Sequence, residues 1–260
     1  MRPTAIRRTA VAATVMSLAL LTAACGSDVA DKEGGDKGKA AGTSSAQPSA
    51  AKVLSAAELE DVALVQGEVK GHKVAKAGPE DSVSADDITA DKAACDVFAD
   101  ALMGAATGTP AASTKRKVTS EPKKGVDDNS ADADEAFEAA FDITTTLTTL
   151  SSYEGKGAEE SVAGLRTAAS GCASGFTLTA AGSKQKIVKI TEAKVEGGEE
   201  AAGWTVNTES DGDRMTMKLV QVRQGSTVAS FTALNLAAAA SGKDFELPTA
   251  VIDAQVAKLA

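Results

Sequence analysis

Residues 204–233 read WTVNTESDGDRMTMKLVQVRQGSTVASFTA, and this stretch decides the fold. Side chains suited to a buried face recur at every second position around Asp211-Gly212, at 204, 206 and 208 before it and at 215, 217 and 219 after it. Alternation with a period of two indicates strands, and Asp-Gly strongly favours a two-residue hairpin turn. Gln224-Gly225 is a second turn signal, and alternation resumes after it. The stretch therefore predicts three consecutive antiparallel strands.

The alternating pattern extends toward the N-terminus. Residues 176–178 and 188–190 form two short runs, and Gly197-Gly198 marks a turn before the decisive stretch. Farther upstream, residues 141–147 alternate within a threonine-rich segment, which favours another strand. Together these runs predict an antiparallel meander.

Four segments have apolar residues at helical spacing instead. In the first of them, Ser55 followed by Glu58 matches a capping box, while Gly104 and Gly171 are stop signals for two others. The predicted helices cover 54–64, 90–103, 158–169 and a last segment that begins at Pro248. Strands in antiparallel order flanked by helices predict a single α+β domain over 53–260, with the helices packed on one face of the sheet.

Composition excludes several classes of function. The 260 residues include 27 Lys+Arg and 36 Asp+Glu, which gives a formal net charge of −9. An acidic chain lacks the positive charge that binds nucleic-acid phosphates. One histidine (His72) and three cysteines are too few for a multi-ligand zinc or iron–sulfur site. We therefore expect no nucleic-acid partner, no metal and no cofactor.

The first 24 residues have the three parts of a secretory signal peptide. Three arginines come first, an apolar run over 10–21 follows, and small residues close the segment. Residues 21–25, LTAAC, resemble the bacterial lipobox, which implies that Cys25 receives a diacylglyceryl group and becomes the mature N-terminus. The expected location is then the extracytoplasmic face of the cell membrane, where the lipid on Cys25 is the membrane contact. The alternative is an ordinary secreted protein with a chance cysteine.

Two polar stretches are predicted to lie outside the packed core. Residues 25–52 are expected to form a flexible stalk behind the lipidated cysteine, because they hold almost no large apolar side chain. Residues of about 107–134 are expected to form a long mobile surface loop. The basic run Lys115–Lys117 within it is interpreted as solvated, with a binding patch as the alternative.

Cys95 and Cys172 remain as a pair once Cys25 carries lipid. Outside the cytoplasm such a pair favours a disulfide, which would join the helix at 90–103 to the end of the helix at 158–169. Two buried free thiols or a catalytic thiol are the alternatives.

Few residues suggest chemistry. Trp204 is the candidate for ligand contact because indole offers a large apolar area and one donor, although its alternation with Val206 also fits a core position. Ser120-Glu121-Pro122-Lys123 matches the Ser-x-x-Lys pattern of penicillin-interacting enzymes, but Pro122 indicates a loop where those enzymes need a helix. His72 lies in a polar turn. No catalytic residue is assigned.

Residues 54–74 resemble a segment common in actinobacterial lipoproteins, in which Leu-x-x-x-x-Leu precedes an acidic Gly-Asp-Val-Pro-Gly-Tyr turn. Glu68, Lys70 and His72 depart from that turn. The order of the later elements is similar to that of the extracellular sensor-like domain of mycobacterial receptor Ser/Thr kinases. These elements are a cysteine on a helix, a long loop, a strand, a helix ending in Cys172, strands around 220–228 and a terminal helix. The resemblance implies an extracytoplasmic domain with a ligand cleft and no established catalysis. Those kinase domains have a second disulfide, for which this chain has no cysteines, and no binding residue is carried over.

Three functions follow as hypotheses. The first is a membrane-anchored ligand-binding or sensor-like module, whose ligand would be a small molecule, a lipid or an envelope protein. The second is an accessory interaction protein of the cell envelope. The third is an envelope hydrolase, for which His72 is the only available histidine.

Overall fold

The computed structural model describes residues 51–81, 83–122, 139–210 and 212–260. All of them belong to one compact unit that begins at Pro48. The predicted signal peptide (1–24), Cys25 and the stalk up to residue 50 lie outside the described residues. None of the helices in the described ranges has the length and hydropathy needed to span a bilayer.

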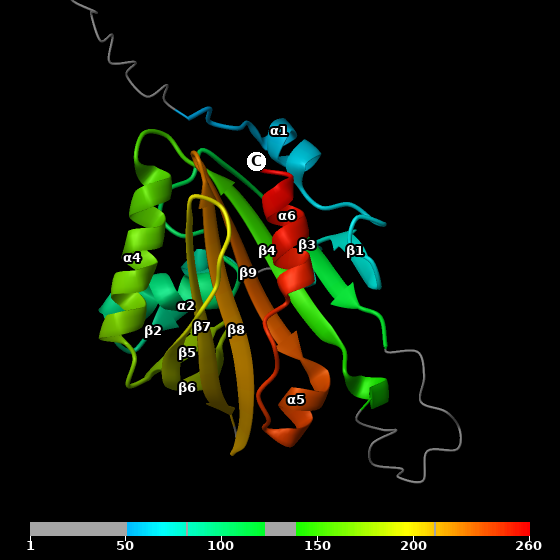
Figure 1. Ribbon diagram of the computed structural model, residues 1–260. Helices are drawn as coiled ribbons and strands as arrows, with labels where there is room; N and C mark the ends of the chain where they lie inside the picture. The colour runs from blue at the N-terminus through cyan, green and yellow to red at the C-terminus, as the bar shows by residue number, and fades with distance from the viewer. Residues whose placement is uncertain (1–50, 82, 123–138, 211) are drawn as a thin grey trace, which may run out of the picture. The chain divides into compact units, whose positions relative to one another are not determined.

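The described residues form a nine-stranded antiparallel sheet with helices around it (Figure 1), so the predicted α+β class is confirmed. The strand order is β1-β3-β4-β9-β8-β7-β6-β5-β2. The strands are β1 (His72–Lys76), β2 (Ile88–Ala90), β3 (Ala112–Ser120), β4 (Thr144–Ser152), β5 (Phe176–Ala180), β6 (Ser183–Ala193), β7 (Glu200–Ser210), β8 (Asp213–Gln224) and β9 (Thr227–Asn235). The helices are α1 (Ala56–Val62), α2 (Asp96–Leu102), α4 (Gly157–Gly171), α5 (Leu236–Ser241) and α6 (Thr249–Ala257).

Strands β5 to β9 form the predicted meander. Ser210 pairs with Asp213 across the first predicted hairpin, and Gln224 pairs with Thr227 across the second. The first turn falls where the Asp-Gly signal predicts it. The second turn consists of Gly225 and Ser226, one residue later than the Gln224-Gly225 signal, because Gln224 is the last residue of β8. The remaining strands extend this meander, with β4 pairing with β9 on one side and β2 with β5 on the other.

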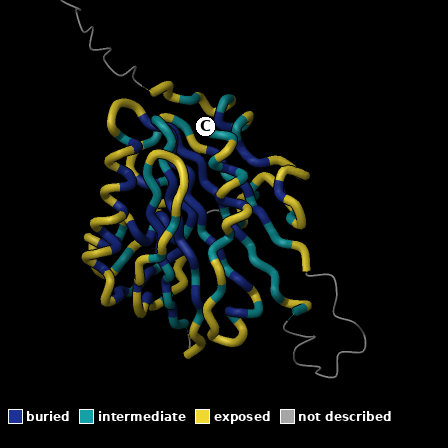
Figure 2. Tube along the Cα trace, viewed as in Figure 1, coloured by how far each residue is buried: buried dark blue, intermediate teal, exposed yellow. Residues whose placement is uncertain are grey.

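Helices cover both faces of the sheet, which corrects the expectation of one covered face. Leu219 of β8 packs in a core with α2 and α4, whereas its neighbours Val220 and Val222 pack in a second core with α1 and α6. Figures 1 and 2 show α4 and α6 on different sides of strands whose central residues are buried. The reason is that β8 and β9 are apolar on both faces near their paired ends, and each apolar face must be covered.

The first two predicted helices are present but shorter than expected. Helix α1 begins with the predicted capping box, in which the Ser55 side chain accepts from the Glu58 amide and Glu58 accepts from the Ser55 amide. The predicted helix over 90–103 contains a 3₁₀ turn (Ala93–Cys95) followed by α2, because β2 occupies its first residue. Gly104 follows α2 with φ of 74°, a left-handed conformation that favours glycine.

Strand β6 differs from the predicted alternation. Ile187 and Ile190 are buried, whereas Val188 is 37% exposed. The pairing of β6 with β7 shifts between Ile187 and Lys189. This irregularity adds one residue to β6 and turns Val188 outward.

The prediction of a mobile loop over about 107–134 is wrong for residues 112–120. These residues form β3, which lies between β1 and β4. Thr114, Arg116 and Val118 alternate as buried residues, so the basic run is part of a strand. Arg116 is buried because its guanidinium has partners: Nε donates to the Leu64 carbonyl at 3.0 Å and Nη2 donates to Glu60 at 2.9 Å. Residues 123–134 of the predicted loop lie outside the described residues.

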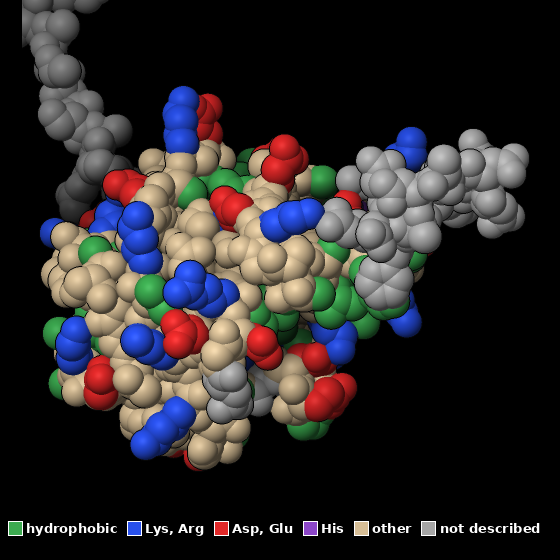
Figure 3. Space-filling view, turned by 90° about the horizontal axis from the view of Figure 1, so that it is seen from below, with side chains coloured by type: hydrophobic (Ala, Val, Ile, Leu, Met, Phe, Trp, Pro, Cys, Tyr) green, Lys and Arg blue, Asp and Glu red, His purple; other side chains and the backbone are tan. Residues whose placement is uncertain are grey.

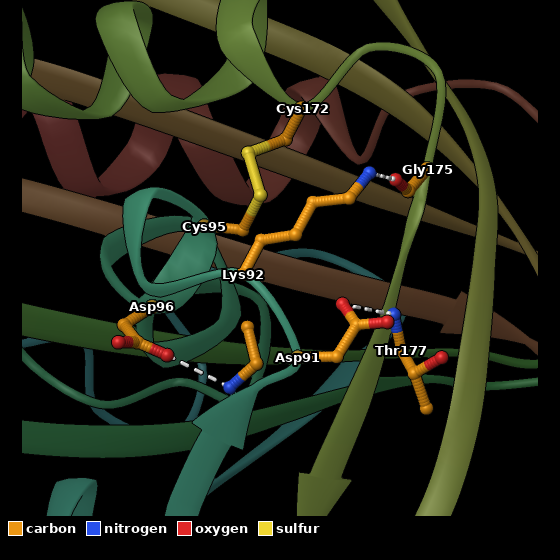
Figure 4. The surroundings of a disulfide bond; sticks show 8 residues. Asp91, Lys92, Cys95, Asp96, Cys172, Gly175 and Thr177 are labelled. Carbon is orange, nitrogen blue, oxygen red and sulfur yellow. Dashed lines mark hydrogen bonds between the residues drawn. A yellow bond between two sulfur atoms is a disulfide. The ribbon is translucent and has the colours of Figure 1, made fainter.

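A disulfide joins Cys95, just before α2, to Cys172, just after α4, with their Cα atoms 5.9 Å apart. The pairing is the predicted one. Figure 4 shows two further links beside it: the Lys92 ammonium donates to the Gly175 carbonyl at 2.7 Å, and the Thr177 amide donates to Asp91 at 2.9 Å. The segment before α2 is therefore attached to the end of α4 and to β5 by three separate links.

Candidate functional site

A groove of about 820 Å³ lies at one end of the sheet. Its lining residues lie within 71–72, 120–121, 139–144 and 235–248. These segments are the start of β1, the end of β3, the start of β4 and the chain from the end of β9 to the start of α6. Three other hollows hold about 350, 340 and 290 Å³.

Asn235, the last residue of β9, holds three parts of the groove together. Its side-chain nitrogen donates to Asp142 at 2.8 Å and to the Thr144 hydroxyl at 3.0 Å. Its side-chain oxygen accepts from the Ala238 amide at 2.9 Å and so caps α5. Because Asn235 is only 3% exposed, these bonds are shielded from water and fix the start of β4 against α5.

A buried cation fixes a second wall, the segment 243–248. The ammonium of Lys218 in β8 donates to Asp244 at 2.7 Å and to the Thr205 hydroxyl at 2.8 Å. It also lies 5.4 Å from the centre of the Phe245 ring, within the range of a cation–π contact. Lys218 is 4% exposed, and its buried charge is compensated by Asp244, whose side chain is 65% exposed.

The third wall brings together two residues that the sequence analysis considered. His72 and Ser120 are direct partners across β1 and β3, and both line the groove. Each is already held by the backbone: His72 Nδ1 lies 2.9 Å from the Lys70 carbonyl, and Ser120 Oγ accepts from the Thr144 amide at 2.9 Å. We find no hydrogen bond between the two side chains themselves within the described ranges. The structure therefore places the histidine near the serine, as the hydrolase hypothesis needs, but it does not show the base–nucleophile bond that would activate Ser120.

Trp204, the predicted ligand contact, lies in the core. It is 5% exposed, and its ring meets the Phe98 ring edge to face at a centroid distance of 5.8 Å. It does not line the groove. The alternative stated with the prediction, a core position that follows from the alternation with Val206, is the one observed.

One carboxyl group has a raised pKa. Partial burial, and to a smaller extent the charge of Asp96, raise the pKa of Asp100 to about 6. Perturbed carboxyl groups are candidates for acid–base chemistry. Neither residue lines the groove, however, so this pair is not part of the candidate site.

Charged residues of both signs are distributed over the surface. Figure 3, which views the domain from below, shows basic and acidic side chains interspersed, with hydrophobic side chains between them. Within the part of the chain that the structure describes, no group of three or more His, Cys, Asp or Glu residues could hold a metal ion.

Comparison with known proteins gives a structural likeness without a sequence relative. No protein-family model matches the chain, and a search of curated proteins found no relative. Its structure is similar to that of the extracellular domain of PknH from Mycobacterium tuberculosis. The two share 12% sequence identity, the TM-score is 0.45, and the match covers 80% of this chain and 95% of the other.

The resemblance implied a ligand cleft, but the position of the groove was not predicted from the sequence. Asn235 carried a usable signal, because asparagine directly before Leu-Ala-Ala-Ala-Ala fits an N-cap and a short helix. The role of Lys218 had no such signal, since its partner Asp244 comes 26 residues later. Cys25, the predicted lipidation site, lies outside the described residues.

Proposed function

We propose that this protein is a ligand-binding, sensor-like module without catalysis, tethered at the extracytoplasmic face of the membrane by lipid on Cys25. The observation that carries the binding role is the groove of about 820 Å³, whose walls are fixed by Asn235 and Lys218. A preformed hollow with a few placed polar groups is the usual form of a small-ligand site. The lipobox-like sequence at 21–25 supports the tether.

The chemistry of the groove favours an amphipathic ligand with a cationic or hydrogen-donating group. Four of the lining side chains are carboxylates, and one is a lysine: Glu121, Asp142, Asp244, Glu246 and Lys243. Apolar side chains from 245, 247 and 248 line the same hollow. In the adjoining segments Phe141 is 40% exposed and Leu236 is 48% exposed, so further apolar area is accessible nearby.

The chain reaches the domain at the end opposite the groove. The Leu54 amide donates to the Ser152 hydroxyl at 2.8 Å, and the Ser226 hydroxyl donates to the Lys52 carbonyl. Ser152 ends β4, whereas Thr144, at the start of β4, lines the groove (Figure 1). A nine-residue strand spans roughly 26–30 Å. The described chain therefore begins at the end of the domain away from the groove.

Filling the groove tests the binding role. Dodecylammonium is a suitable probe because it joins an apolar chain to a positive charge. We expect it to perturb the amide resonances of 235–248 in the wild-type protein. Ala237→Trp, on the groove side of α5, should weaken this binding at least tenfold because the indole occupies the hollow.

Ala240→Trp is the matched control for this experiment. It places the same side chain on the same helix, at an exposed position that does not line the groove. Binding by this variant should equal that of the wild type. Equal binding by Ala237→Trp, or perturbed resonances elsewhere than 235–248, would remove the groove as the binding site.

Replacing Cys25 tests the tether. Wild-type protein expressed with its leader is expected in the membrane fraction, and Cys25→Ser is expected in the soluble fraction, because acyl chains supply the membrane affinity. Intact-mass measurement of the wild-type protein should show a diacylglyceryl group on residue 25. An unmodified cysteine or an uncut leader contradicts the tether and leaves the groove experiment unaffected.

A further inference from the structure

A row of buried polar side chains crosses the sheet beneath α4. Thr149 of β4 is paired with Ser230 of β9, and Ser230 is paired with Gln221 of β8. Their exposed fractions are 1%, 6% and 1%. The outer two bond to the segment that follows α2: Thr149 donates to the Gly104 carbonyl at 2.9 Å, and Gln221 Nε2 donates to Thr107 Oγ1 at 3.2 Å. The row thus lies between the sheet and residues 104–107.

The polar groups next to this row have partners. The Tyr153 hydroxyl donates to the Thr107 carbonyl at 2.6 Å, and the Thr107 and Ser161 hydroxyls are bonded to each other. Tyr153, Thr107 and Ser161 are all buried. Bonds from β8, α4 and the residue after β4 therefore converge on Thr107.

Two atoms of the row are exceptions, namely Gln221 Oε1 and Ser230 Oγ. Both are buried, and neither has a hydrogen-bond partner among the described residues. Leaving a buried polar group without a hydrogen-bond partner costs free energy that is a substantial fraction of a protein's net stability. Native proteins therefore rarely leave such a group without a partner. Direct cross-strand partners have Cβ atoms about 4.5–5.5 Å apart, so the Gln221 and Ser230 side chains are immediate neighbours on one face of the sheet.

We propose that a single internal water molecule binds between Gln221 Oε1 and Ser230 Oγ. Gln221 Oε1 can only accept a hydrogen, whereas the Ser230 hydroxyl can donate one, and a water molecule matches both needs at once. Thr149 Oγ1, next in the row, gives its own hydrogen to Gly104 and retains a lone pair for the second hydrogen of the water. Internal waters typically make about three such bonds.

Other occupants fit this site less well. An apolar guest would leave both atoms without partners, and an ion would find no opposite charge in the row Thr149, Ser230 and Gln221. Water also connects the sheet to the segment 104–107 through the same row. The site is independent of the groove, because none of its residues lines it.

Removing the Ser230 hydroxyl tests the proposal through the sign of the stability change. If water binds there, Ser230→Ala removes one of its partners, and the folding equilibrium constant of the full chain should fall about five- to thirtyfold. If the hydroxyl has no partner in the folded protein, the same substitution should leave the constant unchanged or raise it. Unfolding in urea measures the difference.

Thr148→Val is the matched control. Thr148 Oγ1 is also buried without a partner among the described residues, but it lies on the other face of β4. Its cross-strand neighbours are Arg116 and Phe231, so no second unpartnered atom of the described chain stands beside it to share a bridging water. Removal of this hydroxyl should leave stability unchanged or increase it. A crystal structure should show ordered density within hydrogen-bond distance of both Gln221 Oε1 and Ser230 Oγ; a direct bond between these two atoms, or empty density, would overturn the proposal.

Discussion

Replacing both Cys95 and Cys172 by alanine is expected to lower the free energy of unfolding by about 4 kcal/mol. The disulfide joins residues 77 positions apart, so its loss releases a long loop in the unfolded chain. In a domain of this size the melting temperature should fall by roughly 8–16 °C. Thermal unfolding followed by circular dichroism measures the change.

The wild-type protein unfolded in the presence of reducing agent is the control for this prediction. It should have the same free energy of unfolding as the double variant, because both lack the same cross-link. The neighbouring links from Lys92 and Asp91 remain in each case, so α2 should still pack against α4 at low temperature. A loss below about 1 kcal/mol would contradict the expectation and indicate that the reduced, unfolded chain keeps residual structure.

Replacing Arg116 by alanine is expected to cost about 2 kcal/mol of stability, because hydrogen bonds to a charged partner and to a carbonyl are lost. The Arg116 side chain is 8% exposed and bonds to the carboxylate of Glu60 and the carbonyl of Leu64. Its removal leaves both acceptors without this donor at the junction of α1 and β3. Unfolding in urea at neutral pH, with an unchanged slope against denaturant, measures the effect.

Lys117→Ala is the matched control, because Lys117 is the next residue of the same strand and forms an ion pair with Asp81. Its side chain is 37% exposed, so its removal should cost less than about 1 kcal/mol. Similar losses for the two variants would contradict a special role for the buried guanidinium.

The same pair of residues predicts a dependence on pH. Hydrogen bonds from Thr114 and then from Arg116 lower the pKa of Glu60 from 4.5 to about 2. A carboxyl group with a lowered pKa stabilises the fold above its unfolded pKa, and this contribution is lost as pH falls. The stability difference between wild type and Arg116→Ala should therefore shrink between about pH 4.5 and pH 2.

Local signals explain what the sequence predicts well. The two hairpins depend on adjacent residues around Gly212 and Gly225, although the second turn lies one residue later than its signal, and the capping box at Ser55 spans only four residues. Features that depend on distant partners were missed. Strand β3 was taken for a loop because Lys115–Lys117 are charged, although the buried positions 114, 116 and 118 alternate as in any strand. Only the fold shows that Glu60 lies opposite Arg116.

The candidate site was less predictable than the fold. His72 and Ser120 were noted for their chemistry, yet 48 residues separate them and only the register of β1 with β3 makes them neighbours. Trp204 was chosen because large aromatic side chains often contact ligands. The same size makes it a core residue where Phe98 packs against it.

The open sheet has two outer strands, and both are poor templates for polymerisation. Strand β2 has three residues and β1 has five, so each offers few backbone groups to an approaching chain. On β1 the exposed Lys73 and Lys76 add charge, which opposes edge-to-edge aggregation. At high local concentration the nine-stranded sheet of one molecule is thus not readily extended by the next.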